Sequence, residues 1–274
     1  MTILAVSPHL DDAAFSAGGA LATAVADGHT VVVATVFTRS VPDPTGFALA
    51  CQTDKGLGPD ADYMAVRRAE DADACARIGA VPVWLDLPEA PHRGYGSAEA
   101  LFDGAHDDDR GTWEDVRDAL APVLRERRPG LVLSCQGLGG HVDHLHTARA
   151  VAALTHSSPE VTSWWRDQPY ALRGDAAAPA PGLPGGLREV GLPLTVEALT
   201  VKLDGCAAYA SQLPYQFARD AGGADGGPAE AMRQRLAAFA RSEGARFGFR
   251  LPAEAFATGH PDAWNRLWDV SPLR

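Results

Sequence analysis

Residues 2–38 decide the fold, and they read TILAVSPHLDDAAFSAGGALATAVADGHTVVVATVFT. The first six of these residues form a short apolar run that ends at Pro8, and residues 11–27 then carry alanine and leucine at helical spacing. Gly28 follows where a helix end needs a left-handed residue, and residues 30–38 are β-branched almost throughout. This order of strand, helix and strand predicts an α/β fold with a parallel sheet.

The rest of the chain continues this alternation as far as residue 155. Further helices are expected over residues 63–78, 112–127 and about 143–155, with strands over 81–87 and 131–134. Residues 40–62 contain proline and glycine without a clear period, which predicts a long functional loop, interpreted here as a specificity lid.

The pattern loosens in the last part of the chain. The expected elements there are a strand over 161–172, a surface loop over 174–186 and helices over 199–213 and 229–241. No internal repeat and no clean linker divides the chain. We therefore predict one doubly wound domain over residues 1–274, with the motif-bearing α/β core at about 1–160 and an irregular part at about 161–274.

Composition restricts the partners. The chain has 24 basic and 35 acidic residues, a formal net charge of −11, which disfavours binding to nucleic acid or to anionic lipid. No apolar run approaches the roughly 20 residues of a membrane-spanning helix, and the first residues do not resemble a signal peptide. The four cysteines are far apart, so free thiols and a cytoplasmic location are expected, while the oligomeric state is left open.

The first candidate site is PHLDD at residues 8–12, directly after the first strand. Ligands bind outside the carboxyl ends of the strands in open α/β sheets. His9 and Asp12 are three residues apart at the head of a helix, so both can face one metal ion, and imidazole and carboxylate are good zinc donors. Asp11 then lies where a general base acts on metal-bound water. The alternative interpretation is a helix cap, a common role for aspartate.

The second candidate site is HVDHLH at residues 141–146, at another strand-to-helix junction. His144 completes a set of two histidines and one aspartate that leaves a position open for water. His141 is placed to donate a proton, and Asp143 to orient that imidazole. Solvated histidines at a polar helix start are the alternative, and His146 faces elsewhere on the helix.

The two motifs together resemble the P-H-x-D-D and H-x-D-H signatures of the LmbE-like (PIG-L) zinc-dependent N-deacetylases. The resemblance implies a Rossmann-like sheet with helices on both faces, and hydrolysis of N-acyl groups from glucosamine-containing conjugates. It implies His9, Asp12 and His144 as metal ligands, Asp11 as base and His141 as acid or electrostatic stabiliser. Zinc is the expected metal, and iron(II) is the alternative because these ligands accept either.

Weaker similarity extends the resemblance to about residue 213. Arg67 and Glu70 resemble an R-x-x-E helix of the family, and residues 202–212 resemble its K…Y-x-S-Q helix. Residues 37–42 and 138–140 depart from the family pattern where substrate is read, so the molecule that carries the acyl group is left open beyond a glucosamine-type or related conjugate.

Other substrate contacts carry weaker signals. Arg67 is a candidate for binding a hydroxyl or anionic group, against the alternative of a solvated charge. The Asp107–Asp109 run is interpreted as a solvated loop. His92 and His106 are interpreted as loop residues that at most border the pocket. Trp164–Trp165 is interpreted as part of the core.

The sequence therefore predicts a metal-dependent amide hydrolase that deacetylates a small N-acylated molecule. An amidase of the same family that cleaves thiol–sugar conjugates is the nearest alternative. A nucleotide-binding module is disfavoured because no G-x-G-x-x-G loop follows the first strand. A non-catalytic scaffold is disfavoured because the five-residue first motif is intact.

Overall fold

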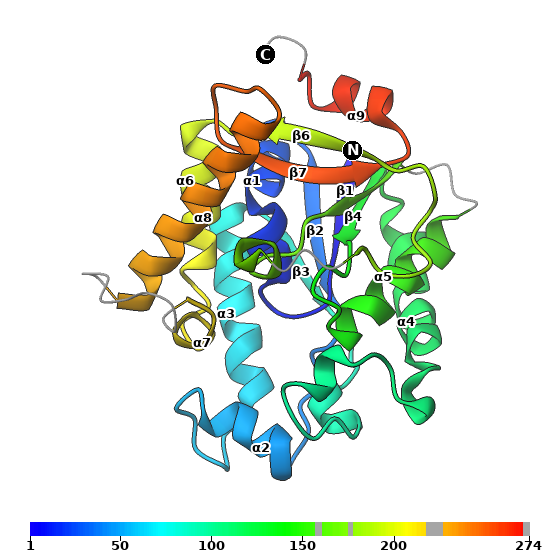
Figure 1. Ribbon diagram of the computed structural model, residues 1–274, viewed down its shortest axis with the longest axis vertical. Helices are drawn as coiled ribbons and strands as arrows, with labels where there is room; N and C mark the ends of the chain where they lie inside the picture. Colours follow the sequence, from blue (N-terminus) through cyan, green and yellow to red (C-terminus); the bar gives the residue numbers. More distant parts are fainter. Residues whose placement is uncertain (157–160, 175–177, 218–226, 271–274) are drawn as a thin grey trace.

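A seven-stranded sheet with the order β3-β2-β1-β4-β5-β7-β6 forms the centre of the protein in the computed structural model (Figure 1). The structure describes residues 1–156, 161–174, 178–217 and 227–270. The strands are β1 Thr2–Ser7, β2 Thr30–Thr35, β3 Val81–Trp84, β4 Leu131–Cys135, β5 Val161–Trp165, β6 Arg188–Pro193 and β7 Ala253–Thr258. The α-helices are α1 Asp12–Ala26, α2 Gly46–Thr53, α3 Tyr63–Ile78, α4 Thr112–Arg127, α5 Val142–Thr155, α6 Val196–Cys206, α7 Leu213–Phe217, α8 Gly227–Arg246 and α9 Pro261–Leu267.

Strand β1 lies between β2 and β4 and pairs in parallel with both. Ala5 of β1 is in register with Val33 of β2 and with Leu133 of β4. Residues 3–6 of β1 are fully buried, as expected for a strand covered on both faces. Because β1 and β4 are parallel neighbours, the loops that follow them meet at one edge of the sheet.

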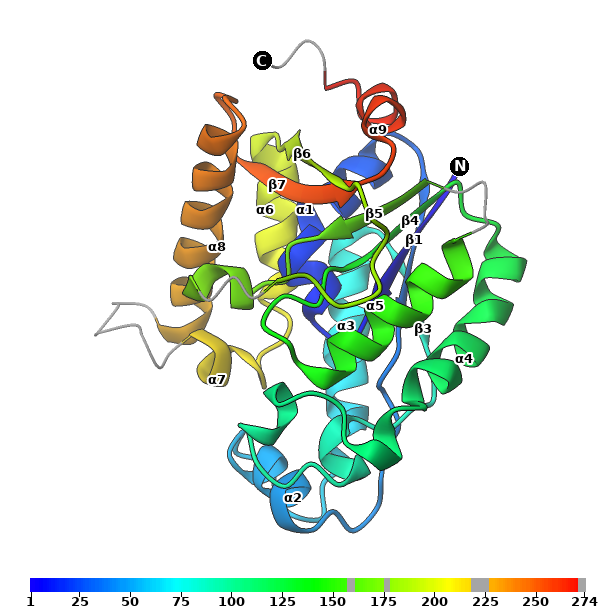
Figure 2. The same cartoon turned by 45° about the vertical axis from the view of Figure 1, so that its right-hand side comes forward.

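Helices cover both faces of the sheet (Figure 2). Helices α1, α3, α6 and α8 lie on one side, and α4 and α5 lie on the other. Helix α1 packs closely against Leu194 at Gly19. A Cβ atom added at Gly19 would lie 2.5 Å from Leu194 Cδ1, so a larger residue would not fit there. The predicted α/β fold with a mostly parallel sheet and helices on both faces is confirmed.

The end of the chain contributes to this same sheet. Strand β7 runs antiparallel to β5, and β6 runs antiparallel to β7. Neither β6 nor β7 was expected from the sequence, and the expected strand over 161–172 ends at Trp165. Trp164 and Trp165 are fully buried, which confirms their assignment to the core. Part of the expected loop at 174–186, residues 175–177, lies outside the described residues.

The predicted loop at 40–62 is not wholly irregular, because helix α2 occupies its middle. A short helix of eight residues between proline- and glycine-containing ends leaves too few periodic positions to be recognised from sequence.

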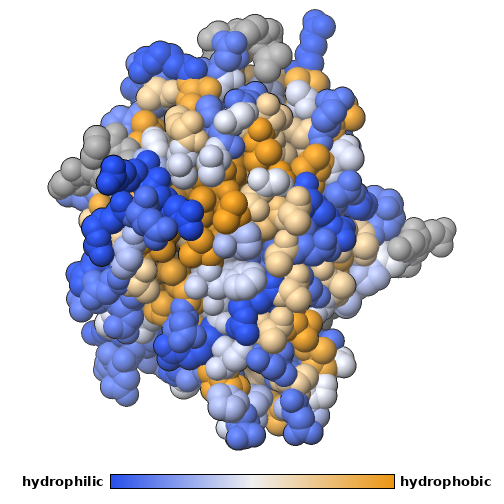
Figure 3. Space-filling model, turned by 180° about the vertical axis from the view of Figure 1, so that it is seen from behind, coloured by the Kyte–Doolittle hydropathy of each residue, from blue (hydrophilic) through white to orange (hydrophobic). Residues whose placement is uncertain are grey.

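The outer surface mixes hydrophilic residues with hydrophobic ones that gather along the middle of the face seen from behind (Figure 3). In the part of the chain that the structure describes, no helix has both the length and the apolar character needed to cross a membrane.

Candidate metal centre

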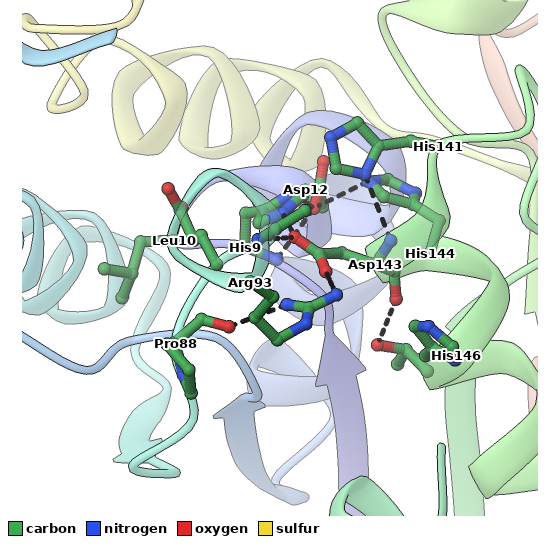
Figure 4. Close-up of polar contacts among 12 residues, drawn as sticks. His9, Leu10, Asp12, Pro88, Arg93, His141, Asp143, His144 and His146 are labelled. Atoms are coloured by element: carbon green, nitrogen blue, oxygen red, sulfur yellow. Dashed lines mark hydrogen bonds and ion pairs between the residues drawn. The ribbon is translucent and has the colours of Figure 1, made fainter. Parts of the chain in front are cut away.

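The two sequence motifs meet at the edge of the sheet where β1 and β4 end (Figure 4). His9 follows β1, and Asp12 opens helix α1. His141 caps helix α5 after β4, and His144 lies in the first turn of that helix. The sheet therefore brings together side chains that lie far apart in the chain.

His9, Asp12 and His144 place three potential ligand atoms close together. Asp12 Oδ2 lies 3.2 Å from His9 Nδ1 and 3.2 Å from His144 Nε2. Zinc bonds of about 2.0–2.1 Å in a tetrahedron separate ligand atoms by about 3.3 Å, so the spacing suits the ion. His144 Nε2 is buried and has no hydrogen-bond partner in the described part of the chain, although it lies at ion-pair distance from Asp12. A nitrogen of this kind fits a metal ligand.

Each of the two histidines is held by a second carboxylate through its other ring nitrogen. His144 Nδ1 lies 2.7 Å from Asp167 Oδ1, and His9 Nε2 lies 2.9 Å from Asp143 Oδ2. Carboxylates in this position fix the ring orientation and the tautomer of metal-binding histidines. Asp143 was expected to orient His141, but the structure places its carboxylate on His9 instead. Only the backbone N–H of Asp143 reaches His141, donating to Nδ1 at 3.2 Å.

Arg93 extends this support away from the centre. Its Nη2 donates to Asp143 Oδ1 at 2.7 Å, and its Nε donates to Asp109 Oδ1 at 2.7 Å. Asp109 also accepts a hydrogen bond from the Tyr95 hydroxyl and lies 2.9 Å from His146 Nε2. Asp109 is thus buried, which corrects its assignment to a solvated loop, and His146 has a structural role.

The electrostatics of the ligand set favour a cation. Burial would lower the pKa of His9, but the carboxylates of Asp12 and Asp143 outweigh burial and raise that pKa to about 9. The pKa of His144 is likewise raised against the effect of burial, chiefly by Asp12. Burial would raise the pKa of Asp12, but the two histidines hold it well below its usual range. The negative potential that binds protons here also suits a divalent ion.

Asp11 points into the pocket beside the ligand set and does not belong to it. Its side chain is 3% exposed, and its Oδ1 lies 3.6 Å from Arg67 Nη2. Burial raises the pKa of Asp11 to about 6, opposed by the charge of Arg67. Gln216 Nε2 approaches the other carboxylate oxygen at 3.5 Å.

His141 faces the same space from the opposite motif. Its ring centroid lies 5.0 Å from that of His9 and 5.4 Å from that of Phe102. Burial and the nearby His9 lower the pKa of His141 to about 3. Because its Nδ1 accepts the backbone bond from Asp143, the proton of the neutral ring lies on Nε2.

These residues line one pocket, and several of its other walls were not expected from the sequence. Arg67 lines it as predicted, but it is buried and paired with Glu89 rather than solvated. His92 and His106 are absent from the lining, and His106 stacks on Tyr95. The remaining lining includes residues of α2, of the 98–102 turn and of α7, with others close to them in the chain, namely Phe47, Lys55, Tyr63, Phe102, Gln212 and Tyr215.

Four buried or half-buried residues of the site were not identified from the sequence: Glu89, Arg93, Asp109 and Asp167. Each acts through a partner far away in the chain, and none belongs to a recognisable local motif. A charged residue shortly after a strand end could have pointed to some of them, but charged residues are common in such loops.

Comparisons with known proteins agree with this geometry. The GlcNAc-PI de-N-acetylase (PIG-L) family matches residues 4–155. The 2'-N-acetylparomamine deacetylase of Streptomyces fradiae is 33% identical over 175 residues, which cover 63% of this chain and 59% of that protein. The match thus spans less than two thirds of the length of this relative.

Two solved structures align over nearly the whole chain. The zinc-inhibited form of the teicoplanin deacetylase Orf2 has a TM-score of 0.80 at 27% identity, covering 94% of this chain and 97% of the other. The A40926 pseudoaglycone deacetylase Dbv21 has a TM-score of 0.76 at 29% identity, covering 93% and 96%.

Proposed function

Because the chain belongs to the GlcNAc-PI de-N-acetylase (PIG-L) family, we propose that it is a zinc-dependent hydrolase that removes an N-acyl group, foremost acetyl, from a glucosamine-type or related small conjugate. The observation that carries the proposal is the convergence of His9, Asp12 and His144 on one point, with Asp11 and His141 beside them in a pocket. The similar 2'-N-acetylparomamine deacetylase and A40926 pseudoaglycone deacetylase support the same reaction class.

The spacing of the donor atoms and the buried His144 Nε2 support binding of a divalent metal. His9, Asp12 and His144 would hold the ion, with Asp143 and Asp167 fixing the two imidazoles. When bound, the metal supplies a Lewis acid that polarises the acyl carbonyl and makes water more acidic. Zinc is favoured by the set of two imidazoles and one carboxylate. The similar deacetylase Orf2 has been solved in a zinc-inhibited form, which concerns inhibition of that protein and not its working metal. Iron(II) shares the same ligand preferences.

Asp11 acts as the general base in this proposal. Its carboxylate lies in the pocket next to the ligand set. Arg67 Nη2 lies 3.6 Å from Asp11 Oδ1, an ion-pair distance that is too long for a hydrogen bond. The carboxylate can therefore accept a proton from the attacking water. Hydrolysis adds the water oxygen to the acyl carbon and breaks the carbon–nitrogen bond.

His141 serves the other side of the reaction. Its Nε2–H faces the pocket, so it can donate a hydrogen bond to the oxygen that becomes negatively charged in the tetrahedral transition state. The proton taken by Asp11 passes to the departing nitrogen, which leaves as an amine. The products are a carboxylate and the free amino sugar.

Release of acetate from N-acetylglucosamine glycosides by the zinc-loaded protein tests the reaction. We expect equal amounts of acetate and free amine, and no release by the Asp12→Asn variant, which lacks a ligand. A zinc-loaded wild type that releases no carboxylate from any N-acyl glycoside in a panel of varied aglycones would refute the proposal.

The same proposal covers partners and location. A pocket lined by catalytic residues suits a small molecule, and the net charge of −11 disfavours nucleic acid or anionic membranes as partners. The four cysteines are free, in keeping with the reducing cytoplasm.

A further inference from the structure

The two lysines of the chain have opposite surroundings. Lys202 is fully buried, and its Nζ donates to Glu254 Oε1 at 2.7 Å. Lys55 lines the pocket just after helix α2. Within residues 1–156, 161–174, 178–217 and 227–270, no carboxylate forms an ion pair with Lys55. A counter-ion for this lysine is therefore missing from the described part of the chain.

The contacts of Lys55 leave part of its ammonium group unused. Its Nζ donates to the Cys51 carbonyl oxygen at 2.9 Å. The same atom lies 5.2 Å from the ring centroid of Tyr63 and 5.1 Å from that of Tyr215. The two rings attract a cation but accept no strong hydrogen bond, and an ammonium group has three donors. Lys55 thus keeps hydrogen-bonding capacity on the side that faces the pocket.

The half-buried Lys55 remains a cation. Burial opposes its charge, but Tyr63 and Cys51 together outweigh burial and raise the pKa of Lys55 above its usual value. Holding a partly desolvated charge without a counter-ion costs free energy. Arg67, which also lines the pocket, avoids this cost through Glu89 and Asp11.

Lys55 is connected to the reaction centre through the Tyr63 ring and Arg67. The Tyr63 ring is contacted by both cations, Lys55 and Arg67, and the Arg67 Cζ atom lies 5.5 Å from the ring centroid. Arg67 in turn lies 3.6 Å from Asp11. A molecule whose amide reaches Asp11 can therefore place another of its groups at Lys55. Because the carboxylates of Asp11 and Glu89 are already paired with Arg67, Lys55 is left as a cation that can pair with an acidic group of such a molecule.

We propose that Lys55, Tyr63 and Tyr215 form a subsite for an anionic group of the substrate, a carboxylate or a phosphate carried away from the scissile amide. This proposal rests on the deacetylase function proposed above and narrows its substrate to acidic N-acylated glycosides. Polycationic aminoglycosides are correspondingly poor substrates, because their ammonium groups would face Lys55.

Matched neutral and anionic probes test the subsite. Methyl N-acetylglucosaminide is compared with its C6-carboxylate and C6-phosphate forms, and phenyl N-acetylglucosaminide with its 4-carboxyphenyl analogue. We expect at least one anionic probe to exceed its neutral parent by about 10- to 100-fold in kcat/KM, mainly through KM. Which probe gains most distinguishes carboxylate from phosphate, and an acid on the sugar from one on the aglycone.

Variants of Lys55 assign the effect to this residue. Lys55→Gln should abolish the preference for the anionic probes over their neutral parents, whereas Lys55→Arg should keep most of it. Arg125→Gln, an exposed cation on α4, is the control and should leave this preference unchanged. The subsite is refuted if no anionic probe exceeds its neutral parent, or if Lys55→Gln slows neutral and anionic probes equally.

Calorimetric binding of the same probes to Asp11→Asn protein separates this proposal from the deacetylase function. If no probe is hydrolysed by the wild type, yet the anionic ones bind more tightly in a Lys55-dependent way, the reaction is wrong and the subsite stands. If the neutral probes are hydrolysed and the anionic ones bind no better, the reaction stands and the subsite is wrong.

Discussion

The floor and the rim of the pocket are built in contrasting ways. At the floor, the side chains around the candidate metal are held by other buried groups, as in the series His9, Asp143, Arg93 and Asp109. At the rim, Lys55 and Tyr215 come from short helical segments or the turns beside them, and Tyr215 is 42% exposed. A rigid floor suits a metal that needs fixed ligand geometry, while a sparsely supported rim can differ between proteins that share the chemistry.

This contrast assigns different consequences to mutations in the two regions. Changes at the floor should alter metal binding or the chemical step. Changes at the rim should alter substrate affinity and leave the metal in place.

The largest effect on turnover is expected at Asp11. Comparing Asp11 with its neighbour Asp12 distinguishes the proposed base from the proposed metal ligand. Asp11→Asn should lower kcat by about 10²- to 10⁴-fold with metal content unchanged, because it removes a general base and no ligand. Asp12→Asn should instead lose the metal. Steady-state kinetics and metal analysis of both proteins check this, and near-normal turnover by Asp11→Asn would overturn the assignment.

The next effect is expected at Asp143, which holds His9 and is not one of the three proposed ligands. Asp143→Asn keeps the shape but loses the charge opposite Arg93 and His9, so metal affinity should fall by about 10- to 100-fold. Competition with a chelator measures this affinity. Asp118→Asn, an exposed carboxylate on α4, should leave it unchanged. Unaltered affinity in Asp143→Asn would mean that the floor network does not support the metal.

A smaller effect on stability and on KM is expected at Ser211, which links the rim of the pocket to α3. Ser211 Oγ donates to Glu70 Oε2 at 2.7 Å and accepts from Gln212 Nε2 at 2.7 Å, which positions Gln212 in the pocket. Ser211→Ala should cost about 1 kcal/mol in the free energy of unfolding and raise KM severalfold at constant metal content. Chemical denaturation, steady-state kinetics and metal analysis measure the three quantities.

Ser242→Ala is the matched control for this change, since the exposed Ser242 hydroxyl bonds the backbone of α8. Loss of metal in Ser211→Ala would show that rim and floor are not independent.

Sequence patterns predicted the parts of the fold that depend on local periodicity. Helices Tyr63–Ile78 and Thr112–Arg127 and the first strand have the expected bounds because each carries its own apolar face. Strand β7 escaped prediction because its buried Glu254 breaks the apolar run. That carboxylate is satisfied by Lys202 and by two backbone N–H groups of α1, which are contacts that only the tertiary structure creates.

The site divides in the same way. The five residues proposed for chemistry, His9, Asp11, Asp12, His141 and His144, lie in two compact motifs, and their residue types alone suggest metal hydrolysis. Asp167 and Arg93 could not be found, because their importance comes from the side chains that they orient across the fold. The role of Asp143 was misplaced for the same reason, since its distance from His9 in the chain hides their contact.

Metal content of the purified protein, measured by mass spectrometry beside His144→Ala, decides whether His9, Asp12 and His144 form a metal site. We expect about one zinc or iron per chain in the wild type and none in the variant. His156→Ala, an exposed histidine at the other end of α5, should retain the metal. Equal metal content in wild type and His144→Ala, or a wild type that binds none when zinc is supplied, would contradict this assignment.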